Sequence, residues 1–219
     1  MKTFAIGDIH GCRVALETLL EAIAPSPDDL TVCLGDYVDR GPDSKGVVDT
    51  LLEFRKTHKL VHLKGNHEIQ MEAARKTTRA HEFFIRDVVG GADTLSSYGC
   101  SIHEISDEHW DFLMNESQPC YETDSHIFVH GGVQPHLPIS EQTISTFCWE
   151  RFHTATPHMS GKTVVCGHTI QGDTPTNYRG LNICIDTCAY GGGWLTGLDI
   201  DSGTYIQSNE KGEIRHGNI

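Results

Sequence analysis

The sequence predicts an α/β fold, and three observations lead to this class. Six short apolar runs rich in β-branched residues recur along the chain, and each ends at a glycine or a polar residue. Such runs are typical of buried strands. Helical patterns lie between the first three runs, and this alternation is typical of βαβ units with parallel strands. The ends of the runs also carry a concentration of aspartate, asparagine and histidine.

The predicted elements follow in chain order. The strand runs occupy residues 3–6, 30–34, 59–64, 126–129, 163–166 and 182–185. Apolar side chains recur at helical spacing over residues 14–23 and again over residues 47–54. Pro42 and Ser44 are start signals for the second helix.

The remainder of the chain is less regular. Residues 68–122 are polar and helical in places, around Trp110, Leu113 and Met114, and contain no clear strand. We interpret them as a helical excursion. Residues 194–206 predict a β-hairpin with its turn at Ser202 and Gly203. Without internal repeats or linkers, residues 1–219 are predicted to form a single domain.

Composition narrows the possible functions. The net charge of −13 argues against non-specific binding to nucleic acid or to an anionic membrane, because both need a basic face. The apolar runs are far shorter than the roughly 18 residues that span a bilayer. The first residues lead directly into a motif rather than a secretory signal, so we expect a cytoplasmic protein. The eight scattered cysteines contain no CxxC pair and are expected to be reduced.

Polar side chains at the strand ends predict a metal site. Ligands gather beyond the carboxyl ends of the strands in a parallel sheet, so these side chains should meet. Asp8 and His10 are two residues apart and face the same way at a strand end, so both can bind one ion. The predicted ligands are Asp8, His10, Asp36, Asn66, His130 and His168.

The types of ligand favour a pair of divalent ions. Asp36 has two carboxylate oxygens and can bridge two ions, and mixed nitrogen and oxygen ligands suit manganese, iron or zinc, with manganese preferred here. Two divalent ions, Asp8, Asp36 and a bridging hydroxide leave one net positive charge, which attracts a phosphate dianion. Paired ions lower the pKa of bound water and so supply a nucleophile. Arg40 and Arg151 can each bind two phosphoryl oxygens.

Five motifs occur in order along the chain. They are Gly-Asp-Ile-His-Gly at 7–11, Gly-Asp-Tyr-Val-Asp-Arg-Gly at 35–41, Gly-Asn-His-Glu at 65–68, His-Gly at 130–131 and Gly-His at 167–168. On these motifs the sequence resembles the metal-dependent phosphoprotein phosphatases of the calcineurin-like metallophosphoesterase superfamily, and most of all the small bacterial and bacteriophage serine/threonine protein phosphatases. The resemblance implies central β-sheets flanked by helices, with a dinuclear metal site at the carboxyl ends of the strands.

The resemblance also implies roles for individual residues. One ion would be held by Asp8, His10 and Asp36, and the other by Asp36, Asn66, His130 and His168. His67 would protonate the leaving oxygen and Asp39 would steady His67, while Arg40 and Arg151 would hold the phosphate. The implied reaction is in-line attack of a metal-bridging hydroxide on phosphoserine or phosphothreonine in a protein or peptide.

Alternatives remain open at this stage. Residues 186–192 also resemble a segment of the symmetrical diadenosine tetraphosphatases, although those relatives tend to lose the aspartate that matches Asp39 and to carry aspartate in place of Glu68. A non-catalytic scaffold that binds metal or a partner is a third possibility. Asp39 and Arg40 could form a salt-bridged turn, and Arg151 could form a surface ion pair with Glu150 or Asp186.

Overall fold

The computed structural model describes residues 1–152 and 156–219 and contains two β-sheets. The six-stranded sheet has the order β11-β10-β9-β1-β2-β3. β1, β2 and β3 are parallel, as predicted, and the three C-terminal strands join them through the antiparallel pair β1–β9. Its strands are β1 Thr3–Ile6, β2 Leu30–Cys33, β3 Lys59–His62, β9 Leu195–Asp199, β10 Thr204–Ser208 and β11 Ile214–Asn218.

The five-stranded sheet has the order β4-β5-β6-β8-β7. Its central strands β5, β6 and β8 are parallel, and antiparallel strands close both edges. The strands are β4 Cys120–Glu122, β5 His126–Val129, β6 Thr163–Cys166, β7 Thr176–Tyr178 and β8 Asn182–Cys184. Buried side chains from both sheets, among them Val32 and Phe128, form one cluster, so the sheets pack face to face.

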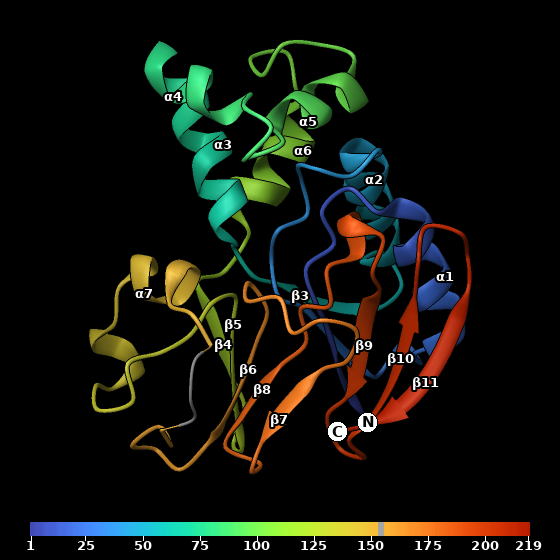
Figure 1. Cartoon of the computed structure of the whole chain (residues 1–219), viewed down its shortest axis with the longest axis vertical. Helices are drawn as coiled ribbons and strands as arrows, with labels where there is room; N and C mark the ends of the chain where they lie inside the picture. The colour runs from blue at the N-terminus through green and yellow to red at the C-terminus, as the bar shows by residue number, and fades with distance from the viewer. Residues whose placement is uncertain (153–155) are drawn as a thin grey trace.

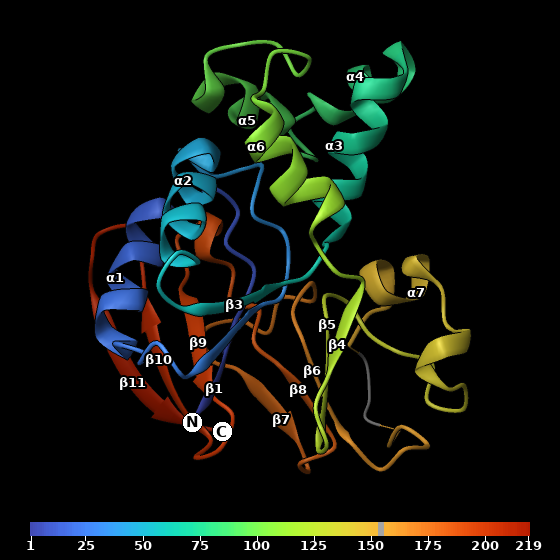
Figure 2. The same ribbon diagram turned by 180° about the vertical axis from the view of Figure 1, so that it is seen from behind.

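Helices cover the outer faces of the two sheets (Figures 1 and 2). α1 Arg13–Ile23 and α2 Ser44–Phe54 cover the first sheet, and α7 Ile144–Trp149 covers the second. Residues 66–115 form a separate group, here called the helical lobe, which projects beyond the ends of the strands (Figure 1). It contains α3 Asn66–Lys76, α4 Thr78–Phe84, α5 Gly91–Tyr98, α6 Asp107–Trp110 and a π-helical turn, Asp111–Asn115.

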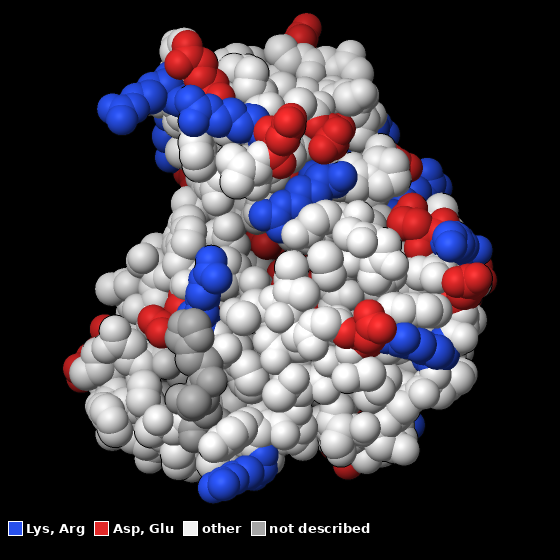
Figure 3. All heavy atoms as spheres, viewed as in Figure 1, with Lys and Arg blue, Asp and Glu red and all other residues white. Residues whose placement is uncertain are grey.

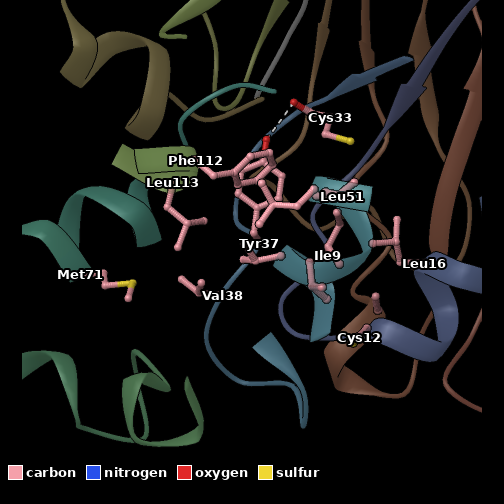
Figure 4. Close-up of a cluster of buried hydrophobic side chains, with 14 of the residues drawn as sticks. Ile9, Cys12, Leu16, Cys33, Tyr37, Val38, Leu51, Met71, Phe112 and Leu113 are labelled. Carbon is pink, nitrogen blue, oxygen red and sulfur yellow. Dashed lines mark hydrogen bonds between the residues drawn. The ribbon is translucent and has the colours of Figure 1, made fainter. Parts of the chain in front are cut away.

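Tyr37 connects the core to the strand ends. Its side chain is fully buried among residues of the first sheet, α2 and the helical lobe (Figure 4). The hydroxyl lies 2.8 Å from the Leu63 carbonyl oxygen and 3.3 Å from that of Cys33, so one ring spans the ends of β2 and β3. Tyr37 therefore anchors the backbone next to the predicted ligand Asp36.

Most of the predicted elements are confirmed, with one correction. All six strand runs are strands, and β9 and β10 form the predicted hairpin. The prediction that residues 68–122 contain no strand is wrong at its end, because Cys120–Glu122 is β4 and pairs with β5. Only three residues pair there, too few to show an alternating pattern. Within the described residues, no helix is both long and apolar enough to cross a membrane.

Candidate active site

The six predicted ligands converge at the carboxyl ends of strands from both sheets. Asp8 and His10 follow β1, Asp36 follows β2, and Asn66 begins α3 just after β3. His130 and His168 follow β5 and β6 of the second sheet. Five of the ligands are buried and His168 is half-buried.

A cavity of about 320 Å³ opens over these strand ends. The space-filling view shows the surface hollowed below the helical lobe, with basic side chains on both sides and acidic atoms in its depth (Figure 3). All four predicted catalytic residues are at the site: three line the cavity, and Asp39 lies behind His67. The lining residues are Asp8, His10, Asp36, Arg40, Asn66, His67, Arg151, His168, Thr169, Ile170, Asp186 and Tyr190.

Asp36 lies at the centre of the potential ligands. The Nε2 atoms of His10 and His130 are each 3.4 Å from its Oδ2 atom, and that of His67 is 4.0 Å away. Two groups of three donors could each hold a metal ion within the described residues, namely His10, Asp36 and His67, and Asp36, His130 and His168. Because Asp36 belongs to both, its position is that of a bridging ligand.

Asp8 is placed differently from the other predicted ligands. Its carboxylate belongs to neither group of three and instead accepts hydrogen bonds from the backbone N–H of His168, at 2.9 and 3.2 Å. It nevertheless lines the cavity and is buried. Asp8 therefore ties the first sheet to the His168 loop as well as facing the site.

Glu68 fixes the backbone that presents Asp36. Its buried carboxylate accepts hydrogen bonds from the backbone N–H groups of Asp36 at 3.0 Å, Tyr37 at 2.9 Å and Gly65 at 2.9 Å. Asp36 itself accepts a hydrogen bond from the His67 backbone N–H at 3.0 Å. The loop after β2 and the start of α3 are thus bound to each other around the central carboxylate.

The site is rich in buried carboxylates, and Asp36 and Asp8 raise the pKa of His130 to about 10 despite its burial. Burial lowers the pKa of His10 to about 3 and that of His168 to about 4, so both imidazoles are neutral, as metal ligands must be. Nδ1 of His10 lies 2.9 Å from the Val38 carbonyl oxygen, and Nε2 lies 3.2 Å from Nη1 of Arg40. Burial and nearby carboxylates raise the pKa of Asp186 to about 6 and that of Asp8 well above its usual range. Divalent ions would relieve this crowding of negative charge.

His67 and Asp39 form the predicted pair. Nδ1 of His67 lies 2.7 Å from Oδ2 of Asp39, and both side chains are almost completely buried. Burial disfavours the charged imidazole, but Asp36 and Asp39 outweigh this effect and raise the pKa of His67. The structure does not place Asp39 in a salt-bridged turn with Arg40, because the Asp39 carboxylate is directed to His67.

The helical lobe holds Asp39 from the opposite side. Thr94 of α5 donates its hydroxyl to Oδ1 of Asp39 at 2.6 Å and accepts a hydrogen bond from the Asp39 backbone N–H at 2.8 Å. Ser44 lies 3.1 Å from the same hydroxyl. Both oxygens of the Asp39 carboxylate therefore have a partner, one on α3 and one on α5.

Three contacts place Arg40 and leave its positive charge available, and one of them joins Nη1 to Nε2 of His10 at 3.2 Å. Its backbone N–H donates to the Gly90 carbonyl of the helical lobe at 3.2 Å, and a Cβ on Gly90 would lie only 2.5 Å from that nitrogen. The guanidinium lies over the Tyr190 ring at 4.7 Å. An aromatic face positions the cation without neutralising its charge, whereas a carboxylate would neutralise it.

Backbone conformation at the site is unusual. Eight non-glycine residues in the described parts of the chain have a positive φ, and six of them are at or beside the cavity. Non-glycine residues adopt this region uncommonly, because Cβ crowds the backbone. The six are His10, Asp36, Asp39, Arg40, His168 and Cys188.

Sequence reasoning missed several residues of the site. Asp186 follows the β8 run and lines the cavity, so the strand-end rule that selected Asp36 could have selected it too. Thr94, Ile170 and Tyr190 had no comparable signal, because each reaches the site from a helix or loop. Within the described residues, Arg151 forms no ion pair with Glu150 or Asp186 and instead lines the cavity.

The family model for calcineurin-like phosphoesterases matches residues 1–172, which include every predicted site residue. The chain belongs to the calcineurin-like phosphoesterase family. This membership confirms a metallophosphoesterase fold and a hydrolase, and it implies the dinuclear site that the two donor groups around Asp36 can form.

Curated relatives of this phosphoesterase include symmetrical bis(5'-nucleosyl)-tetraphosphatases. The protein of Janthinobacterium sp. (strain Marseille) is 32% identical over 62% of this chain and 45% of its own length. That of Nitrosomonas europaea is 29% identical over 74% of this chain and 58% of its own length. The chain spans about half the length of these relatives.

Solved structures support the fold of the phosphoesterase. A crystal structure described as a candidate diadenosine tetraphosphatase has a TM-score of 0.70 and 21% identity, covering 99% of this chain and 93% of the other. A cold-active protein-tyrosine phosphatase of Shewanella sp. has a TM-score of 0.69 and 17% identity, covering 98% and 80%. At such identities the likeness shows the fold alone.

Proposed function

We propose that this phosphoesterase hydrolyses dinucleoside polyphosphates, with symmetrical cleavage of a bis(5'-nucleosyl) tetraphosphate as its reaction. The observation that supports the hydrolytic chemistry is the position of Asp36, which belongs to two groups of side chains that could hold metal ions in a cavity that also contains two arginines. The curated relatives, which are symmetrical tetraphosphatases, support this substrate. They favour it over the phosphoprotein substrate that the sequence motifs alone predicted.

In this proposal Asp8, His10 and Asp36 would hold one ion. Asp36 would also bind the other ion, together with Asn66, His130 and His168. When bound, two divalent ions supply Lewis-acid activation of water and neutralise phosphate charge. Manganese is the proposed metal, with iron or zinc as the other choices that suit this ligand set.

The chain's own residues perform the remaining steps. Arg40 and Arg151 bind the phosphoryl oxygens from the cavity wall. Water loses a proton to solvent and its oxygen forms a bond to phosphorus as the bond from phosphorus to the bridging oxygen breaks. His67 gives a proton from Nε2 to the departing oxygen and regains one from solvent. Asp39 holds Nδ1 of His67 and so keeps Nε2 directed to the cavity. Symmetrical cleavage of a tetraphosphate bridge releases two nucleoside diphosphates.

Hydrolysis of phosphoserine and phosphothreonine in proteins is a second candidate. The buried Asp39–His67 pair favours it, because an alkoxide leaves poorly unless it is protonated, whereas a departing nucleoside diphosphate is a more stable anion.

A substrate panel tests the proposal. The purified protein with Mn²⁺ is assayed on diadenosine tetraphosphate, phosphoserine and phosphotyrosine peptides, and p-nitrophenyl phosphate, with Asp36→Asn as the inactive control. We expect the highest kcat/KM on diadenosine tetraphosphate, with ADP as the sole nucleotide product. A higher kcat/KM on a phosphopeptide would replace this function by the second candidate. Bound metal without turnover of any substrate would identify a scaffold.

A further inference from the structure

A second cavity, of about 260 Å³, adjoins the catalytic cavity on the α7 side of the second sheet. Arg151 lines both cavities. The next residue, Phe152, donates its backbone N–H to Oγ1 of Thr169 at 3.0 Å, and Thr169 lines the catalytic cavity. The two cavities are therefore neighbours that share Arg151 as a lining residue.

The walls of the second cavity combine apolar and polar side chains. Its apolar lining residues include Val164 and Cys166 of β6 and the half-buried Val133 and Phe152. Two side chains that can form hydrogen bonds, Glu150 and Asn182, also line it. The full lining is Gly131, Gly132, Val133, Pro135, Glu150, Arg151, Phe152, Thr156, Val164, Cys166 and Asn182.

The charges of this cavity differ from those of its neighbour. Among its described lining residues Arg151 is the sole cation, and it stands at the boundary, while Glu150 adds a negative charge. Such a site disfavours a second phosphate. A purine, in contrast, can stack on an aromatic ring and offer amino and ring nitrogen atoms to a carboxylate and an amide.

The backbone that borders the cavity is tightly packed at Gly131 and less tightly at Gly132. A Cβ at Gly131 would lie 2.7 Å from the Glu150 carbonyl oxygen, and one at Gly132 would lie 3.1 Å from Cγ of Glu150. The segment after β5 therefore packs directly on the segment that carries Glu150, Arg151 and Phe152.

We propose that the second cavity is a nucleoside subsite, in which the base of the substrate packs against Phe152 while Arg151 binds the adjoining phosphate. This proposal rests on the proposed function and adds to it the part of the chain that distinguishes a nucleotide from a simple phosphate ester. The size of the cavity suits one nucleoside, so the other half of a symmetrical substrate lies elsewhere.

Calorimetric titration tests the subsite without relying on turnover. ADP and methyl diphosphate carry the same diphosphate ester, and only ADP has a nucleoside, so their affinity ratio in the presence of Mn²⁺ isolates the nucleoside contribution. We expect the wild-type protein to bind ADP about tenfold more tightly, since stacking of a base on an aromatic side chain contributes about 5- to 150-fold. Phe152→Leu and Asn182→Ala should each reduce this ratio towards one and leave methyl diphosphate binding unchanged.

Phe83→Leu is the matched control, because Phe83 is an exposed phenylalanine on α4 of the helical lobe and should leave the ratio unchanged. Thermal melting of each variant verifies that it is folded. Equal affinities of wild type for ADP and methyl diphosphate would overturn the subsite, as would a Phe152→Leu variant that keeps the full ratio. If Phe152→Leu binds a phosphopeptide more weakly than wild type but binds ADP equally well, the cavity is a peptide site and the proposed nucleoside subsite is wrong.

The same variants separate this proposal from the proposed function. Phe152→Leu should raise KM for diadenosine tetraphosphate about tenfold, by the same loss of stacking, with little change for p-nitrophenyl phosphate. If the wild type prefers ADP in calorimetry but does not cleave diadenosine tetraphosphate, the subsite stands and the proposed reaction fails. If it cleaves that substrate without preferring ADP, the reaction stands and the subsite fails.

Discussion

Replacing Thr94 by valine tests whether the helical lobe positions the proposed acid. Valine has nearly the shape of threonine but lacks the hydroxyl that donates to Asp39 and accepts from its backbone N–H. Thr94 and Asp39 are both fully buried, so water cannot readily take over these bonds. Thr94→Ser keeps the hydroxyl and serves as the matched control.

The stability cost follows from the lost hydrogen bonds. A buried polar group left without a partner costs about 1–3 kcal/mol. Ser44 remains 3.2 Å from the Asp39 backbone N–H, so the carboxylate oxygen accounts for most of the loss. For a chain of this size each 1 kcal/mol shifts Tm by about 2–4 °C, and we expect Thr94→Val to melt about 2–12 °C below wild type.

The effect on catalysis depends on the leaving group. Without Thr94, Asp39 can rotate and the His67 imidazole loses its fixed direction. The loss in kcat on a phosphoserine peptide is bounded by the contribution of a positioned acid, about 10²–10⁴-fold. An aryl phosphate releases a stable anion and should be affected much less.

The assay measures kcat on a phosphoserine peptide and on p-nitrophenyl phosphate for wild type, Thr94→Val and Thr94→Ser, all at saturating Mn²⁺. We expect the peptide-to-aryl ratio to fall in Thr94→Val and to recover in Thr94→Ser. A ratio equal to that of wild type, in a variant with the lowered Tm, would show that Thr94 stabilises the fold without positioning His67.

Three further predictions concern the metal, the acid and the phosphate clamp. Chelation should abolish activity, and Mn²⁺ at 100 times its Kd should restore it and add about 2.7 kcal/mol to the free energy of unfolding; activity in metal-free protein would contradict this. Asp39 raises the pKa of His67, and an acid works only while protonated, so kcat falls as pH rises through that pKa. Asp39→Asn lowers the pKa of His67 and should move this fall in kcat to lower pH. A pH profile of kcat equal to that of wild type would count against the Asp39–His67 pair. Tyr190→Ala should weaken inhibition by inorganic phosphate about 2- to 30-fold through loss of the contact with Arg40, whereas Tyr190→Phe should retain it; equal inhibition in both would refute the role of the ring.

The metal-ligand positions could be predicted because their signal is local. A buried strand ends, the chain exposes a polar side chain, and parallel strands bring such ends together. This reasoning predicted that Asp36, His130 and His168 would meet, and their side chains do lie together in the structure. It also placed Asp8 at the cavity, but it could not predict the direction of the Asp8 carboxylate. That direction is set by the backbone N–H of His168, a residue 160 positions away.

The supports of these residues could not be predicted from local patterns. Thr94 is 55 residues from Asp39, and nothing in its own helix marks it as more than a buried polar side chain. Tyr190 contacts Arg40 across the two halves of the sequence. The substrate preference was harder still, because motifs shared by a whole family specify the metal chemistry and leave the surrounding cavities unspecified.

The left-handed backbone around the cavity has a consequence for protein engineering. Each such residue other than glycine costs about 1–3 kcal/mol, so the catalytic loops are where stabilising substitutions are easiest to find. Glycine or asparagine at the positions of Arg40 or His168 would relieve the backbone and remove the functional side chain at the same time. A screen that selects for heat resistance alone will therefore enrich inactive variants. A library intended to yield a thermostable enzyme should keep fixed the six positive-φ positions His10, Asp36, Asp39, Arg40, His168 and Cys188.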